Sequence, residues 1–195
     1  MYTIGYATKN ISEYIDQLRR YNVTVVADIR SVPYSNTFYD YHQEALTGHL
    51  RSAGIRYVYL GLELGPRSKD SSHYNEAGQV QFDRLMASEL FKSGINRLQD
   101  GLDKGFSIAL SCAEKDPAIC HRSLLVGWAL KHQYQHELQH ILHSGELESQ
   151  THLEYRLMDL TQTQPDMLTN ESEALELAYQ RQCLAYAYKI PAQVK

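Results

Sequence analysis

The sequence predicts an α/β fold: a layered, mainly parallel sheet flanked by helices and followed by an acidic C-terminal helical segment. Short β-branched runs alternate with segments whose apolar residues recur every three or four positions, as βαβ units require. One run, 23–29, is continuously apolar until Asp28, which is typical of a parallel strand buried on both faces. With 195 residues, 43% apolar and 22% charged, the chain suits a single α/β domain over 1–195, with 149–195 as a helical tail packed on it.

In the first 60 residues we expect three strands and two helices. Asn10 and Glu13 fit a capping box, in which each side chain binds a backbone amide of the first helical turn. Gly54 suits the C-terminal end of the second helix. The expected elements are a strand at 2–6, a helix from 11 to about 20, a strand at 23–29, a helix at 43–53 and a strand at 55–60.

The rest of the chain begins with an expected long loop over 61–80, rich in Gly, Ser, Asp and Lys; such loops in compact domains are usually functional or disordered. A helical stretch is expected at 82–102, broken near Gly94, and a fourth strand at 106–112. Asp116 followed by Pro117 suits a helix start, so a helix is expected from there through Ala129. From about 149 the chain is expected to be mostly helical.

Polar side chains follow three of the expected strands. Ligands of open parallel sheets bind outside the carboxyl ends of the strands, so we expect these side chains to share one rim. The candidates are Asp28, Arg30 and Ser31 after the second strand, Glu63, Gly65 and Arg67 after the third, and Cys112, Glu114, Cys120, His121 and Arg122 after the fourth.

The segment 112–122 supports several chemistries. A helix N-terminus favours an anion, which Arg122 could clamp bidentately. The same surroundings would lower a thiol pKa and make Cys112 or Cys120 a nucleophile, with His121 as its base. These two thiols and the imidazole are also soft metal ligands, although they lack the paired short spacing of structural zinc sites. A purely structural role is the fourth interpretation. The cofactor is therefore unknown, with a divalent metal as one candidate.

The run His136-Glu137-Leu138-Gln139-His140 spells the zinc-peptidase pattern, which needs a helix that presents both histidines on one face. The same residues also fit the fifth strand that a βαβ alternation expects. Histidines four residues apart on a strand lie roughly 13 Å apart, too far to share one zinc ion. We therefore treat a peptidase as the weaker hypothesis.

Charge and cysteine usage narrow the class of protein. The net charge is −4, but residues 135–180 hold only Arg156 against nine carboxylates and residues 181–195 add +3, so the first 134 residues are near neutral at about +1. A uniformly basic nucleic-acid coat is thereby excluded. The three cysteines do not form a disulfide framework, and no apolar run or leader points to a membrane. We expect a cytoplasmic protein without a membrane partner.

Nearly the whole chain resembles the domain-of-unknown-function 488 family of bacterial and archaeal proteins. The segments that carry the resemblance are TIGY at 3–6, DIRSVPYS at 28–35, AGIRY at 53–57, ELG at 63–65, CAEKDP at 112–117, CHR at 120–122 and EALELAYQR at 173–181. The resemblance implies a site formed by Asp28, Arg30, Glu63, Cys112, Glu114, Cys120, His121 and Arg122, and a strand that ends at His140-Ile141. It implies no particular reaction, because the family has no established activity. Pro66 departs from the family pattern, which usually has a second glycine after Gly65.

Our leading hypothesis is an enzyme, a hydrolase or transferase, that binds an anionic small molecule of the phosphate or nucleotide type. Arg30 and Arg122 would position the anion. Asp28 or Glu114 would serve as general acid or base. Cys112 or Cys120 would act as nucleophile or metal ligand.

The second hypothesis is a nucleic-acid-binding or regulatory module. In it, Arg30 and Arg67 would contact phosphates, while Tyr34, Tyr39 and Tyr41 would stack on bases.

Overall fold

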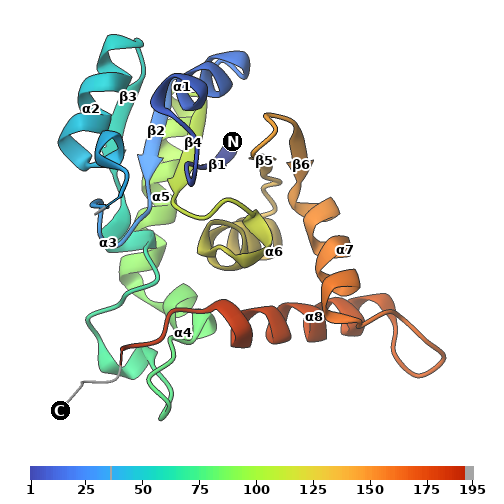
Figure 1. The fold of residues 1–195 in the computed structure, drawn as a ribbon. Coiled ribbons are helices and arrows are strands. Elements are labelled where there is room, and N and C mark those ends of the chain that lie inside the picture. Colours follow the sequence, from blue (N-terminus) through green and yellow to red (C-terminus); the bar gives the residue numbers. More distant parts are fainter. Residues whose placement is uncertain (36, 192–195) are drawn as a thin grey trace.

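The computed structural model describes residues 1–35 and 37–191, which build a six-stranded sheet flanked by helices (Figure 1). The strands are β1 (Tyr2–Gly5), β2 (Val25–Asp28), β3 (Arg56–Tyr59), β4 (Ile108–Cys112), β5 (Gln139–Ile141) and β6 (Leu147–Ser149), in the spatial order β3-β2-β4-β1-β5-β6. The first five are parallel and β6 is antiparallel to β5. The predicted mainly parallel α/β fold is confirmed.

Helices cover both faces of the sheet because the strands are apolar on both faces. The helices are α1 (Ile11–Arg20), α2 (Gln43–Ser52), α3 (Gly61–Leu64), α4 (Phe82–Ala87), α5 (Glu89–Asp103), α6 (Trp128–His132), α7 (Gln150–Thr161) and α8 (Glu171–Tyr186). Val26 of β2 packs in one core with the apolar residues of α1 and α2. Its neighbours Val25 and Ala27 point the other way, into a second core with α5, α6 and α8, since successive strand residues alternate in direction.

The first helix forms as predicted. The Asn10 side chain accepts a hydrogen bond from the backbone N–H of Glu13 at 2.8 Å, and α1 ends at Arg20.

The helical stretch at 82–102 breaks at Ser88, and the prediction of a break at Gly94 was wrong. The Ser88 hydroxyl caps α5 by accepting from the Phe91 amide, whereas Gly94 lies inside α5, where a Cβ would come within 2.7 Å of Glu63 Cβ. Gly94 therefore allows α3 and α5 to approach closely.

Two further segments differ from expectation. The expected loop at 61–80 contains α3, a 3₁₀ turn at Ser71–His73 and an isolated bridge between Tyr74 and Val80. Asp116 does cap a helical turn, but only the 3₁₀ turn Pro117–Ile119, because Cys120 adopts an extended conformation (φ −121°, ψ 141°). The main helix then runs as a π-helical segment, Arg122–Gly127, continued by α6.

The zinc-peptidase hypothesis is wrong for the described structure. His140 lies in β5, buried, with its ring bound to Thr3 and Gln150, and His136 precedes the strand. The two histidines therefore do not share a helix face.

The C-terminal helices pack onto the helix that follows the 3₁₀ turn. Tyr179 of α8 stacks on Trp128 at 3.7 Å between ring centroids, and Gln182 donates to the Ala118 carbonyl at 2.8 Å. Figure 1 shows α8 running past α6 toward α4, so that the chain after α8 returns to the carboxyl ends of the strands. Within the described residues, no helix combines the length and apolar character needed to cross a membrane.

Gly5 marks the closest backbone approach at the carboxyl edge of the sheet. It pairs in register with Cys112. A Cβ at this position would lie 1.9 Å from the Glu114 carbonyl oxygen and 2.5 Å from Arg122 Nη1. Only glycine lets β1 end beside the segment that follows β4.

We therefore expect Gly5→Ala to lower the free energy of unfolding by at least about 2 kcal/mol, because the added methyl group has nowhere to go. Gly48→Ala is the matched control: this exposed glycine inside α2 has no atom within 4 Å of its Cβ position, so alanine should stabilise by roughly 0.5–1 kcal/mol. Urea unfolding of both variants measures the two effects. Equal stabilities for the two variants would contradict the close approach.

Candidate functional site

A cleft of about 450 Å³ opens at the carboxyl edge of the sheet. Its lining includes seven of the residues that the sequence singled out, namely Arg30, Ser31, Tyr34, Arg67, Cys112, Glu114 and His121, together with Tyr6, Tyr186 and Tyr188. These residues come from the segments that follow β1, β2, α3, β4 and α8, so the topology gathers them as the strand-end argument predicted.

Two thiols and an imidazole converge on the floor of this cleft. The sulfur atoms of Cys112 and Cys120 lie 2.9 Å apart, and His121 Nδ1 lies 3.5 Å from the first and 3.9 Å from the second. The Glu114 carboxylate joins them, with Oε2 at 3.0 Å from the Cys112 sulfur and 3.5 Å from the Cys120 sulfur. Cys112 lines the cleft and Cys120 lies behind it.

The orientation of His121 is fixed from outside the cluster. Its Nε2 lies 3.0 Å from the backbone carbonyl oxygen of Ile29, which can only accept a hydrogen bond, so Nε2 carries a proton. In the neutral ring, Nδ1 then presents its lone pair to the two sulfur atoms. This lone pair can accept a thiol proton or bind a metal ion.

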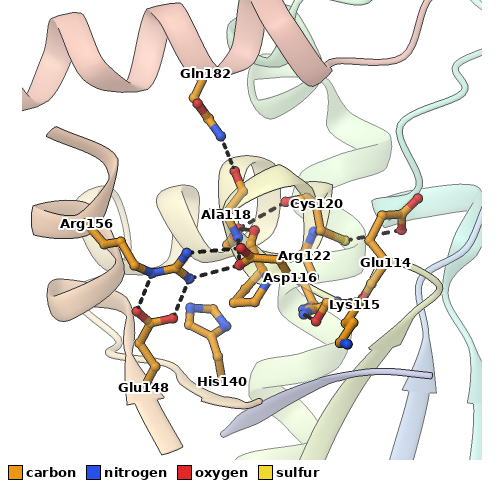
Figure 2. A network of polar contacts seen from close by, with 12 residues as sticks. Glu114, Lys115, Asp116, Ala118, Cys120, Arg122, His140, Glu148, Arg156 and Gln182 are labelled. Carbon is orange, nitrogen blue, oxygen red and sulfur yellow. Dashed lines mark hydrogen bonds and ion pairs between the residues drawn. The ribbon is translucent and has the colours of Figure 1, made fainter. Parts of the chain in front are cut away.

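Arg122 does not line the cleft, contrary to its expected role as an anion clamp. The side chain is fully buried, and its two terminal nitrogens donate to the carbonyls of Glu114 and Lys115 at 2.5 and 3.2 Å (Figure 2). No carboxylate pairs with it among the described residues, and its Nε has no partner there. Arg122 thus holds the segment 114–115 in place and brings a buried positive charge close to the thiols.

This charge helps one thiol of the pair to ionise. Burial opposes ionisation of Cys120, but the hydrogen bond from Cys112, the Arg122 charge and His121 together hold the pKa of Cys120 well below its usual range. Burial and the neighbouring Cys120 raise the pKa of Cys112. Burial also lowers the pKa of His121, but Cys120 and the Ile29 carbonyl more than offset this and raise it. The pair therefore readily loses one proton and resists losing the second.

Asp28 is placed to orient Arg30 rather than to transfer protons in the cleft. It is fully buried and forms a bidentate ion pair with the Arg30 guanidinium at 2.5 and 2.8 Å. Tyr57 donates a further hydrogen bond to it at 2.9 Å. Arg30 in turn donates to Tyr6 and lies 5.0 Å from the centre of that ring.

Glu63 and Arg67, which both follow β3, have different surroundings. Glu63 does not line the cleft but forms an ion pair with Arg97. Arg67 lines the cleft, and its backbone N–H donates at 3.0 Å to the hydroxyl of Ser31, which follows β2. The Arg67 guanidinium lies 4.8 Å from the centre of the Tyr188 ring and has no acidic partner among the described residues.

Of the four tyrosines that line the cleft, sequence reasoning named Tyr34 and missed the other three. Tyr6 lay inside the TIGY segment at 3–6 but carried no chemistry by itself, and Tyr186 and Tyr188 lie at and after the end of a helix far along the chain. The only available signal was the excess of 15 tyrosines over four phenylalanines.

A second polar network supports the segment behind the cluster. Arg156 of α7 binds both Asp116, at 2.9 and 3.1 Å, and Glu148, at 2.7 and 2.8 Å (Figure 2). Asp116 also caps the 3₁₀ turn through the Ala118 amide. This network fixes the segment that leads to Cys120.

The fold and the cluster define an α/β protein with a cysteine–histidine site at the carboxyl end of parallel strands. The model of the family described as "Domain of unknown function DUF488" matches residues 10–129, and the chain belongs to this family. The comparison with curated proteins finds no match.

Among solved structures, the chain is similar to one from Shewanella putrefaciens CN-32 described as "Putative phosphatase (DUF442)". The identity is 11% and the TM-score 0.40, over 95% of this chain and 87% of that one.

His140 lies behind the site in a neutral state. Gln150 donates its amide to Glu154, so its carbonyl oxygen faces His140 Nε2 at 2.9 Å, and His140 Nδ1 accepts from Thr3 at 2.7 Å. Burial, reinforced by the Arg122 charge, lowers the pKa of His140 to about 3 from an ordinary 6.5.

The unfolded chain therefore takes up a proton on His140 at a higher pH than the folded protein does. Stability should fall as the pH drops from about 6.5 toward about 3, by about 2 kcal/mol at pH ~5 from this residue alone. We expect His140→Gln to remove this part of the pH dependence, measured by urea unfolding at pH ~7.5 and ~5. The exposed control His152→Gln should keep it. The same slope in His140→Gln as in the wild type would refute the neutral buried state.

Proposed function

We propose that the protein is an enzyme, a hydrolase or transferase, that binds an anionic small molecule of the phosphate or nucleotide type in the strand-end cleft. The observation that carries the proposal is the combination of two arginines on the walls with the cysteine–histidine cluster on the floor. A bound anion would lie against the reactive groups.

Both arginines keep guanidinium N–H groups that can donate to a ligand. Arg30 uses one N–H each on Nε, Nη1 and Nη2, so two of its five N–H groups stay available. The ion pair with Asp28 fixes its orientation, which reduces the entropy lost when it binds an anion. Arg67 is exposed and has no acidic partner among the described residues. Charge-assisted bonds to phosphate are the strongest use of such groups.

The cleft suits a ligand with a ring as well as an anionic group. Its volume of about 450 Å³ lies within the usual range for small-molecule sites. Tyr6, Tyr34, Tyr186 and Tyr188 line it and offer flat apolar surfaces. This combination favours a nucleotide-like ligand over inorganic phosphate alone.

The groups on the floor can supply proton transfer and nucleophilic or metal chemistry. Glu114 is exposed and contacts both sulfur atoms, so it can exchange protons between the cluster and solvent. In this proposal Asp28 is a positioning residue for Arg30, and Arg122 acts on the cluster through its charge.

The nucleic-acid hypothesis has less support from the geometry. Tyr41 is 1% exposed and stacks on Tyr6 at 4.1 Å, so it cannot stack on a base. Arg30 is buried apart from the surface it gives to the cleft. Tyr34 and Tyr39 are exposed, but the charged groups around the cleft suit one small anion better than a strand.

A reducing compartment such as the cytoplasm suits this site. Cys112, Cys120 and Cys183 are all free thiols, and the two in the cluster need to stay reduced to act as nucleophile or ligand.

The proposal predicts that Arg67→Ala binds AMP and ADP at least about tenfold more weakly than the wild type, since one charge-assisted interaction of roughly 1.5 kcal/mol is lost. Isothermal titration calorimetry measures the two affinities. Arg51→Ala, which removes an exposed arginine on α2 away from the cleft, should bind as the wild type does. A wild-type protein that binds none of phosphate, AMP and ADP would contradict the proposal, as would equal affinities for the two variants.

A further inference from the structure

Cys112, Cys120 and His121 have the donor set of a metal site. Their two sulfur atoms and one imidazole nitrogen all lie within 4.8 Å of one another. Thiolate and imidazole together suit Zn²⁺, which takes Cys sulfur at about 2.3 Å and His nitrogen at about 2.0–2.1 Å. Ligand atoms of a tetrahedral site with those bond lengths lie roughly 3.5–3.8 Å apart.

The two separations between nitrogen and sulfur are close to these values, since His121 Nδ1 lies 3.5 and 3.9 Å from the two sulfur atoms. The sulfur atoms, 2.9 Å apart, would have to separate by roughly 0.9 Å to admit the ion. A rotation of one cysteine side chain covers such a shift.

We propose that these three residues bind a thiophilic divalent cation, Zn²⁺ in the first place, with a fourth coordination position open to the cleft. A structural zinc site is closed by four protein ligands, whereas a catalytic one keeps three and an open position. No fourth cysteine or histidine joins the group among the described residues. Cys112 and His121 line the cleft, so the open position faces the space where a ligand would lie.

The surroundings of His121 have the arrangement that metal-binding histidines require. Its Nε2 donates to the Ile29 carbonyl at 3.0 Å, just beyond the end of β2. This bond fixes the tautomer and aims Nδ1 at the sulfur atoms. The sheet itself therefore holds the imidazole in the ligating orientation.

Charge balance indicates what occupies the fourth position. One divalent cation, two thiolates and a neutral imidazole sum to zero, and Arg122 adds a buried positive charge behind them. The site then favours a negative fourth ligand from outside the protein: hydroxide or the anion itself. This last step rests on the proposed function, whereas metal binding does not.

The test uses the full chain, purified without a polyhistidine tag and without chelators, with zinc measured by mass spectrometry. We expect about one zinc ion per chain in the wild type. Cys120→Ser should retain less than about a tenth of it. Cys183→Ser, which removes the cysteine outside the cluster, should keep the full content. Glu114→Gln should also keep it, because all three protein ligands remain.

Cobalt substitution of the wild type gives a readout that depends on no variant. Bound Co²⁺ should show a sulfur-to-cobalt charge-transfer band in the near ultraviolet and the intense visible bands of tetrahedral cobalt. Wild-type protein that binds neither zinc nor cobalt would overturn the inference, as would cobalt bound without the sulfur band. Recovery of Cys112 and Cys120 as a disulfide from protein kept under reducing conditions would overturn it too.

Arg67→Ala separates this inference from the proposed function. It should keep the zinc content and the cobalt spectrum while losing affinity for AMP. Zinc binding in a wild type that binds no anion would leave the metal site standing and refute the proposed function alone.

Discussion

The buried charge of Arg122 is the constraint on which the site depends. Among the described residues, the Arg122 guanidinium is bound only to the carbonyls of Glu114 and Lys115. A guanidinium out of contact with water is costly unless negative charge forms nearby. Arg122 fixes the segment after β4 through these carbonyls, and Gly5 leaves room for it because glycine has no Cβ. The thiols of Cys112 and Cys120 are where the negative charge can form. One side chain thus links the end of the sheet, the loop conformation and the chemistry of the cluster.

The sheet and the helices hold the remaining groups from opposite sides. The Ile29 carbonyl beyond β2 aims the His121 ring, and Asp28 at the end of the same strand aims Arg30. Behind the cluster, the Arg156 network fixes the 3₁₀ turn that precedes Cys120. Because each orienting contact comes from a buried or paired group, the cleft is organised before any ligand binds, which is what anion recognition and metal binding both need.

Sequence reasoning predicted the sheet and the rim but not the division of roles on that rim. The apolar runs located β2 and β4, and the strand-end rule brought Arg30, Cys112 and His121 to one edge. It could not separate Arg122, which is buried, from Arg67, which is exposed, because both are arginines after a strand. The prediction of one continuous helix from Asp116 through Ala129 was wrong, because local capping signals do not show that Cys120 must be extended to reach Cys112. Contacts from the far end of the chain, such as Tyr188, have no local signal at all.

Two sulfur atoms and one imidazole nitrogen, next to the Arg122 charge, make up the ligand set that we propose for zinc. X-ray absorption at the zinc edge of the purified full chain measures the identity and distance of the ligand atoms. We expect two sulfur neighbours at about 2.3 Å, one imidazole nitrogen at about 2.0 Å and one further light atom. A first shell made only of oxygen and nitrogen atoms, or one with a single sulfur atom, would contradict this ligand set.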